Sequence, residues 1–196
     1  MKIIFIRHAE SIANRAGNQV GYNTNTDKLT EKGEKQAEKL QKIVEKIVRN
    51  IRKNCEQIIE IHCSDTNRAK HTRDIAIQNQ SFDFIINKSS KKLNEIDIGD
   101  IEYENLREKI ISIFKGNPDT HFRNGESRKD VYIRAKKYLN KLNTENLHII
   151  FSHGITIKSI IEGELNIWDE EIHIKNTDLV IYDTDNKKFD FKKIFV

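Results

Sequence analysis

Apolar residues along this chain form short unbroken runs that are separated by longer polar stretches. The runs at 3–6, 58–63 and 147–151 are rich in β-branched residues. Such runs are typical of strands that are buried on both faces of a sheet. We therefore predict that these three segments form the centre of the sheet.

Four weaker segments predict additional strands. Residues 82–86 predict a strand at the sheet edge, and residues 172–174 predict a short strand. The runs at 179–182 and 189–195 are joined by a polar turn at Asp183, Asp185 and Asn186, which predicts a terminal hairpin.

Between the runs, apolar residues recur at helical spacing and predict five helices. These are expected from Leu29-Thr30 through Ile51, after Arg68 through Ile77, at about 104–114, from Glu126-Ser127 through Leu142, and from Thr156 to about Glu162. Thr30 is the expected N-cap of the first helix. Gly33 in its first turn costs about 1 kcal/mol against alanine, so either that cost is tolerated or a backbone passes close by.

Strands that alternate with helices indicate an α/β fold. We expect a three-layer sandwich, with a largely parallel central sheet, helices on both faces and an antiparallel C-terminal hairpin. The sequence contains no internal repeat and no low-complexity linker, so we expect residues 1–196 to form a single domain.

Composition narrows the class of function. Charged residues make up 33% of the 196 residues, with a net charge of +4 and the two signs mixed along the chain. A nucleic-acid-binding domain would instead gather its basic residues on one element, so we expect no nucleic-acid partner. Cys55 and Cys63 have no disulfide or metal-site spacing, and Cys63 is expected to be a small buried hydrophobe. Met1 leads directly into a strand and no apolar run approaches bilayer length, so we expect a cytoplasmic protein without a membrane segment.

Arginine and histidine side chains follow the predicted central strands. Arg7 and His8 end the first strand, Arg68 follows the second, and His153 ends the third of the central runs. The carboxyl ends of parallel strands share one edge, so two His and two Arg can meet although 145 positions separate His8 from His153. Arginine forks match phosphate oxygens, and helix N-termini after Ser64 and Gly154 add N–H donors. The pattern predicts a pocket for a phosphoryl group, without a carboxylate pair for a metal ion.

The segment Arg7-His8-Ala9-Glu10-Ser11 resembles the Arg-His-Gly-Glu-Ser signature of the histidine phosphatase superfamily, also called the phosphoglycerate-mutase-like superfamily. Asn14 lies where this family has a phosphate-contacting Asn. Further segments resemble the family's motifs in the same order along nearly the whole chain. They are Leu29-Thr30, Gly33 and Gln36-Ala37; Ser64, Arg68-Ala69 and Thr72; Leu93 to Gly99; Gly125-Glu126-Ser127 with Asp130 and Arg134; Ser152-His153-Gly154; and Asn176.

The resemblance implies a role for each matched site residue. His8 is the expected nucleophile, which becomes a phosphohistidine and must be neutral to attack; nearby cations should lower its pKa. Arg7, Arg68 and His153 are expected to hold phosphoryl oxygens, and Asn14 is expected to add a neutral donor. Glu95 is the expected proton donor, with Asp97 as its rival two residues on. No cofactor and no metal ion are implied, and the expected partner is a small-molecule phosphomonoester.

Two departures from the family pattern leave these positions intact. Ala9 stands where the family usually has Gly, and Asp65-Thr66 stands where it commonly has Pro-Leu. His62, His71, His121, His148 and His173 match no motif and receive no role. Arg134 and Asp130 are expected to form a structural ion pair.

The family contains phosphatases and mutases, and this chain favours a phosphatase. Only 58 positions separate Glu95 from His153, which leaves little room for the long insertion typical of the mutases. The paired arginines that follow the acid in the mutase branch are also missing. Two alternatives stay open: phosphoglycerate mutase-type phosphoryl transfer, and a non-catalytic phosphate-binding module on the same fold.

Overall fold

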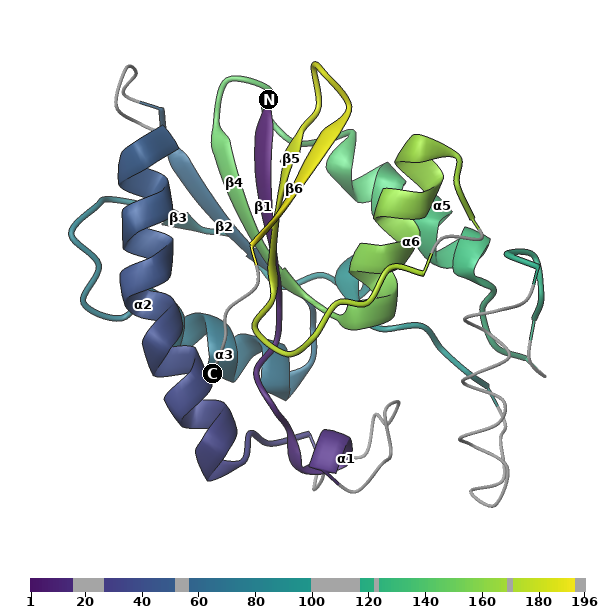
Figure 1. Cartoon of the computed structure of the whole chain (residues 1–196), viewed down its shortest axis with the longest axis horizontal. Helices are drawn as coiled ribbons and strands as arrows, with labels where there is room; N and C mark the ends of the chain where they lie inside the picture. Colours follow the sequence, from purple (N-terminus) through teal and green to yellow (C-terminus); the bar gives the residue numbers. More distant parts are fainter. Residues whose placement is uncertain (16–26, 52–56, 100–116, 122–123, 169–170, 193–196) are drawn as a thin grey trace.

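Strand β1 (Lys2–Arg7) lies inside a six-stranded sheet with the order β3-β2-β4-β1-β5-β6 (Figure 1). The computed structural model describes residues 1–15, 27–51, 57–99, 117–121, 124–168 and 171–192. The other strands are β2 (Ile59–Cys63), β3 (Ile85–Ile86), β4 (Leu147–Ser152), β5 (Leu179–Asp183) and β6 (Lys188–Lys192).

The sheet is parallel on one side of β1 and antiparallel on the other. β1 pairs in parallel with β4, which pairs in parallel with β2, and β2 does so with the edge strand β3. On the opposite side β5 is antiparallel to β1, and β6 is antiparallel to β5. The predicted largely parallel sheet with a C-terminal hairpin is confirmed.

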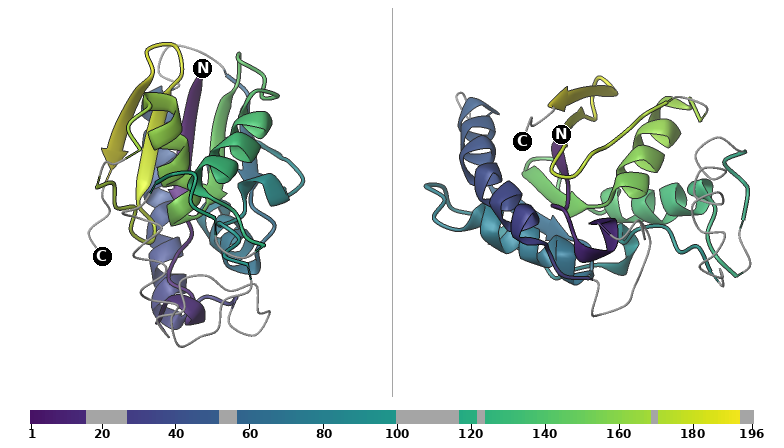
Figure 2. Two further views of the ribbon diagram at one scale, coloured as in Figure 1. Left: turned by 90° about the vertical axis from the view of Figure 1, so that its right-hand side faces the viewer. Right: turned by 60° about the horizontal axis from the view of Figure 1, so that its bottom comes forward.

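Helices cover both faces of the sheet, as Figure 2 shows. α2 (Glu31–Ile51) and α3 (Asn67–Ile77) pack on one face, against the inward side chains Ile4, Ile61 and Ile149. α5 (Arg128–Leu139) and α6 (Gly154–Leu165) pack on the other face, against Ile3 and Phe5. The three-layer prediction is therefore confirmed, and α6 is longer at both ends than predicted. Two short helices, α1 (Ile12–Arg15) and the 3-10 helix η2 (Lys91–Leu93), complete the described elements.

Several predictions concern segments outside the described residues. The helix expected at 104–114, Cys55 and the last residues of the hairpin all fall there. Within the described ranges, no helix combines the length and the apolar character that crossing a membrane requires. Cys63 is fully buried, and this burial raises the pKa of its thiol to about 12, as expected of a small core residue rather than a nucleophile.

The strand predicted at 172–174 is wrong. These residues are irregular, although Ile174 is buried and Ile172 packs against the α5 and α6 side of the core. Both edges of β1 are already occupied by β4 and β5, so no ladder position beside β1 remains. The Ile174 carbonyl instead accepts a hydrogen bond from the Arg7 side chain.

The predicted ion pair between Arg134 and Asp130 is also wrong. Asp130 is the third residue of α5, and its carboxylate accepts hydrogen bonds from the backbone N–H and the hydroxyl of the N-cap Ser127. Capping groups at a helix N-terminus satisfy backbone donors that have no partner inside the helix. Arg134 instead pairs with Glu126, at 2.6 Å.

The start of α2 lies against the loop that follows β1. The Thr30 hydroxyl accepts a hydrogen bond from the Gly33 N–H at 3.0 Å, which confirms Thr30 as the N-cap. The Thr30 N–H donates to the Glu10 carbonyl at 3.0 Å. A Cβ atom built on Gly33 would lie 2.0 Å from that same carbonyl oxygen, so the close backbone approach is the reason for glycine here.

We expect Gly33→Ala to destabilise the protein, although helix propensity alone favours alanine by about 1 kcal/mol. The added methyl group collides with backbone that cannot move without displacing the loop after His8. A net loss of about 1–3 kcal/mol, typical of overpacking, should lower the melting temperature by several degrees. Thermal unfolding followed by circular dichroism measures it. Lys35→Ala, on the exposed side of the same helix, is the control and should change little. A higher melting temperature for Gly33→Ala would disprove the steric argument.

Candidate active site

The carboxyl ends of β1, β2 and β4 bring the predicted residues together. Arg7 of β1 lies in register with Ser152 of β4, so His8 and His153 follow adjacent strands. Their imidazole rings meet edge to face, with centroids 5.0 Å apart. Arg68, in the first turn of α3 after β2, reaches both rings: its Nε lies 3.2 Å from His8 Nε2 and its Nη2 lies 3.4 Å from His153 Nδ1.

The hydrogen bonds of His8 fix which ring nitrogen carries the proton. His8 Nδ1 lies 2.7 Å from the Ala9 carbonyl, which can only accept, so Nδ1 carries the hydrogen. The neutral ring then has its lone pair on Nε2, the atom that accepts the hydrogen bond from Arg68 Nε. The loop is fixed in turn by the Ala9 N–H, which donates to the Thr72 hydroxyl at 3.0 Å. The nitrogen that could act as a nucleophile therefore faces the arginine.

The surroundings keep both histidines neutral. Burial, and then the positive charges of Arg68 and Arg7, hold the pKa of His8 well below its usual value. Burial and the charge of Arg68 lower the pKa of His153 in the same way. The sequence-based expectation that cations lower the pKa of His8 is confirmed, although burial contributes more than the cations do.

Arg7 offers a donor that the protein does not use. Its Nη1 donates to the Ile174 carbonyl at 2.6 Å, but its buried Nε has no hydrogen-bond partner among the described residues. Burial lowers the pKa of Arg7, and the charge of Glu95 opposes that shift. A Cβ on Gly154 would lie 3.3 Å from Arg7 Nε, so glycine lets the guanidinium lie close to the N-terminus of α6. An unpartnered buried N–H is costly unless a ligand accepts from it.

Arg68 has a carboxylate partner that sequence reasoning missed. Its Nη1 donates to Asp27 Oδ1 at 2.5 Å, and both groups are buried. Asp27 also accepts from the Asn67 N–H at 2.6 Å, at the N-terminus of α3. The only signal in the sequence was physical: a buried guanidinium requires a counter-charge, and Asp27 lies in the polar loop between the first strand and the first long helix.

His153 is held by two hydroxyls that follow β2. Its Nε2 lies 2.8 Å from Ser64 Oγ and 3.3 Å from Thr66 Oγ1. The Asp65-Thr66 departure from the family pattern therefore adds a contact to a site histidine. Because Nε2 contacts these hydroxyls, Nδ1 is the ring nitrogen that faces Arg68.

Two asparagines connect the loop after β1 to the segment before β5. Asn176 Nδ2 donates to the His8 carbonyl at 2.9 Å and to Asn14 Oδ1 at 3.0 Å. Asn14 Oδ1 also accepts from the Ser11 N–H at 3.2 Å. Because two donors hold Asn14 Oδ1, its amide orientation is set, and Nδ2 is the atom that it can offer to a ligand.

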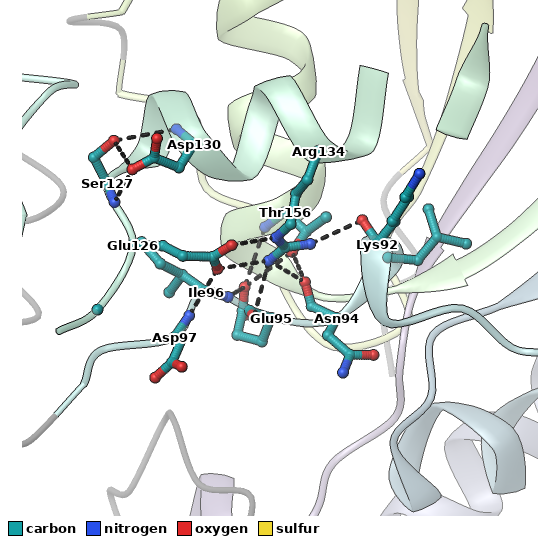
Figure 3. A network of polar contacts seen from close by, with 12 residues as sticks. Lys92, Asn94, Glu95, Ile96, Asp97, Glu126, Ser127, Asp130, Arg134 and Thr156 are labelled. Carbon is teal, nitrogen blue, oxygen red and sulfur yellow. Dashed lines mark hydrogen bonds and ion pairs between the residues drawn. The ribbon is translucent and has the colours of Figure 1, made fainter. Parts of the chain in front are cut away.

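Glu95 is buried at the N-terminus of α6. Its carboxylate accepts hydrogen bonds from the N–H groups of Ile155 at 3.3 Å and Thr156 at 3.1 Å. Asp97, its rival as the proton donor, is exposed, and its carboxylate accepts from the Gly99 N–H. Figure 3 shows the Asp97 side chain pointing away from Thr156. The two carboxylates do not share a face, because the segment is not a regular strand.

Arg134 fastens the segment that carries Glu95 to α5 (Figure 3). Its guanidinium donates to the carbonyls of Lys92 and Asn94, each at 2.8 Å, and to that of Glu95 at 3.1 Å. Glu126 holds the other side of the same guanidinium. Arg134 is therefore a positioning residue for the segment that carries Glu95. The predicted ion pair with Asp130 did not suggest this role.

A comparison with protein families gives one match over nearly the whole chain. The family is the histidine phosphatase superfamily (branch 1), matched over residues 3–196. Among curated proteins, none matches the sequence closely enough to count as a relative.

Solved structures share the fold at low sequence identity. Bacillus stearothermophilus YhfR has a TM-score of 0.76 and 22% identity, over 97% of this chain and 94% of that one. A mycobacterial glucosyl-3-phosphoglycerate phosphatase, solved with VO3, has a TM-score of 0.73 and 16% identity, over 98% of both chains. A phosphoglycerate mutase from Thermus thermophilus has a TM-score of 0.64 and 22% identity, over 93% of both chains.

Proposed function

Because this chain belongs to the histidine phosphatase superfamily, we propose that it is a metal-independent phosphomonoesterase that acts on a small phosphorylated metabolite through a phosphohistidine at His8. The observation that carries the proposal is the pairing of a lone pair on His8 Nε2 with the guanidinium of Arg68, 3.2 Å away. Both side chains are buried, and a phosphoryl group that replaces the hydrogen bond between them would contact the nucleophile and the cation together.

The basic side chains of the site are proposed to bind the phosphoryl group before the chemical steps begin. A phosphoryl dianion that displaces the hydrogen bond between Arg68 and His8 also lies close to His153 Nδ1, since Arg68 contacts both rings. To donate to a phosphoryl oxygen, Nδ1 must carry the hydrogen of the ring, with the Ser64 hydroxyl donating to Nε2. The buried Nε of Arg7 supplies a further donor. Positioning and charge stabilisation contribute most of the catalysis in phosphoryl transfer, so these groups are the expected oxygen ligands.

The first chemical step transfers the phosphoryl group to the enzyme. His8 Nε2 attacks phosphorus in line, an N–P bond forms and the P–O bond to the leaving group breaks. Glu95 gives its proton to the departing oxygen. The His8 Nδ1 hydrogen bond to the Ala9 carbonyl stabilises the ring as positive charge develops on it.

The second step returns the enzyme to its starting state. Glu95, now ionised, takes a proton from a water molecule as that water attacks phosphorus. The N–P bond breaks, its electron pair returns to His8 Nε2, and inorganic phosphate leaves. A mutase would instead keep the phosphoryl group and exclude water. The short interval between Glu95 and His153 and the missing paired arginines support hydrolysis.

Hydrolysis of p-nitrophenyl phosphate should persist in a strong chelator, within about twofold of the untreated rate. The proposed chemistry uses the charges of Arg7 and Arg68 where other phosphatases use metal ions. Circular dichroism in chelator checks that the fold is intact. Loss of activity from folded protein, with rescue by a divalent ion, would contradict the proposal. Phosphate binding without any turnover would instead favour the non-catalytic module.

The substrate class can be tested with a panel of phosphorylated metabolites under the same conditions. The panel should include glucosyl-3-phosphoglycerate and 3-phosphoglycerate, because solved proteins of this fold are named as a glucosyl-3-phosphoglycerate phosphatase and a phosphoglycerate mutase. Release of inorganic phosphate indicates a phosphatase, whereas conversion of 3-phosphoglycerate to its isomer without phosphate release indicates a mutase.

A further inference from the structure

Two histidines without a motif gather with a glutamate on the side of the sheet that α5 covers. Glu60 and His62 are two residues apart on β2, so their side chains share a face. His148 of β4 lies directly opposite Glu60 in the parallel register. His62 and His148 are buried, and Glu60 is half-buried. One ligand atom from each residue lies within 4.8 Å of the other two.

The spacing of these atoms is close to that of ligands around one metal ion. His62 Nε2 lies 3.0 Å from His148 Nδ1, and Glu60 Oε2 lies 3.8 Å from His62 Nε2. Ligands at about 2.0–2.1 Å from a tetrahedral zinc ion are about 3.3 Å apart. Both distances lie within about half an ångström of this spacing, and all three ligand atoms lie within 4.8 Å of one another.

Each candidate ligand is also oriented by a second contact. His148 Nε2 lies 2.8 Å from the Asn143 carbonyl, and His62 Nδ1 lies 2.9 Å from the Tyr138 hydroxyl. Glu60 accepts hydrogen bonds from the amides of Asn87 and Asn146. Histidines that bind metals commonly donate their other N–H to a carbonyl or another oxygen acceptor, which fixes the ring.

The protons in this cluster allow metal binding without an unfavourable charge. The Asn143 carbonyl requires a hydrogen on His148 Nε2, so Nδ1 carries a lone pair. In the metal-free structure His62 Nε2 therefore donates to His148 Nδ1 at 3.0 Å, and the Tyr138 hydroxyl donates to His62 Nδ1. When an ion binds, the hydrogen of His62 moves to Nδ1, which then donates to the Tyr138 hydroxyl, and Nε2 offers its lone pair to the ion.

We propose that Glu60, His62 and His148 bind one Zn²⁺ ion, with a water molecule as the fourth ligand, at a site separate from the phosphate pocket. Two imidazoles and a carboxylate are ligands that zinc accepts. His148 lies five residues before His153 along β4, roughly 16 Å at the strand rise. The ion would join β2 to β4 beneath α5 and would stabilise the fold without taking part in phosphoryl transfer.

The experiment titrates Zn²⁺ into the full chain after chelator treatment and dialysis, by calorimetry and by thermal unfolding. We expect one equivalent to bind, and a melting temperature about 5–10 °C higher when Zn²⁺ is about 100-fold above its dissociation constant. Co²⁺ should bind in competition with Zn²⁺ and give the visible absorption of a four-coordinate ion. Glu60→Gln and His148→Gln should each weaken binding at least about 10-fold.

Matched variants separate this site from other histidines. His71→Gln removes an exposed histidine on α3, and His8→Ala removes a histidine of the phosphate pocket; both should bind Zn²⁺ like the unmodified chain. Glu60→Gln keeps the shape of a half-buried side chain, so it reports on ligation even if His148→Gln unfolds. Three results would each overturn the proposal: no saturable binding at micromolar Zn²⁺, binding that only His8→Ala removes, or binding unchanged in Glu60→Gln and His148→Gln.

Discussion

His8→Ala should abolish both turnover and the covalent phosphoenzyme. Its Nε2 has a lone pair that faces Arg68 and is the proposed nucleophile, so alanine leaves the site without it. Removing a catalytic nucleophile costs on the order of 10³–10⁶-fold in kcat. Steady-state hydrolysis of p-nitrophenyl phosphate measures the loss. Rapid quenching of the unmodified enzyme into alkali should trap phosphate on His8, in an acid-labile and alkali-stable adduct.

The control for His8→Ala is His121→Ala, which removes an exposed histidine far along the chain. It should retain both the adduct and the rate. Melting curves of the two variants show whether the His8 pocket still folds. Phosphate found on Ser11, Ser64 or Cys63 would show that another side chain is the nucleophile.

The core of the site could be predicted from the sequence because its residues follow buried runs. Arg7, His8 and His153 come directly after unbroken apolar segments, and parallel strands bring their carboxyl ends to one edge. Arg68 could be included because it opens the helix that follows β2. The resemblance to the family then distinguished His8 from His153, which position alone does not.

The partners of these residues could not be predicted, since they depend on packing between distant segments. Asp27 lies 41 positions from Arg68, and nothing local separates it from other loop carboxylates. Asp130 lies four residues before Arg134 in the same helix, but its carboxylate caps the helix through Ser127. Arg134 therefore forms its ion pair with Glu126.

A related limit applies to the histidines that match no motif. His62 and His148 are 86 positions apart, and nothing in the sequence around either one distinguishes it from an ordinary core histidine. Only the register between β2 and β4 brings them together. The strand predicted at 172–174 was wrong for a similar reason. Its apolar residues pack against the helical side of the core, and this packing produces the same sequence pattern as pairing in a sheet.

Glu95→Gln should slow the hydrolysis of alkyl phosphates far more than that of p-nitrophenyl phosphate. A poor leaving group needs a proton as the P–O bond breaks, whereas nitrophenolate departs with little help. General acid catalysis typically contributes about 10²–10⁴-fold, so the ratio of the two kcat/KM values should change by that order. Glu95 lies near the site residues, because its carboxylate accepts from the N–H groups of Ile155 and Thr156, which follow His153 and Gly154 in the chain. Kinetics with a series of leaving groups measures the change in slope.

Asp97→Asn is the matched control for Glu95→Gln, since both variants replace a carboxylate by an amide in the same segment. Asp97 is exposed and its side chain turns away from α6, so its variant should show an unchanged dependence on the leaving group. Glutamine loses one acceptor for the Ile155 and Thr156 N–H groups, so a melting curve must accompany the kinetics. A loss of activity that is equal for all leaving groups would indicate that Glu95 only positions α6. The leaving-group effect in Asp97→Asn instead would make Asp97 the acid, and would require the exposed carboxylate to turn inward when substrate binds.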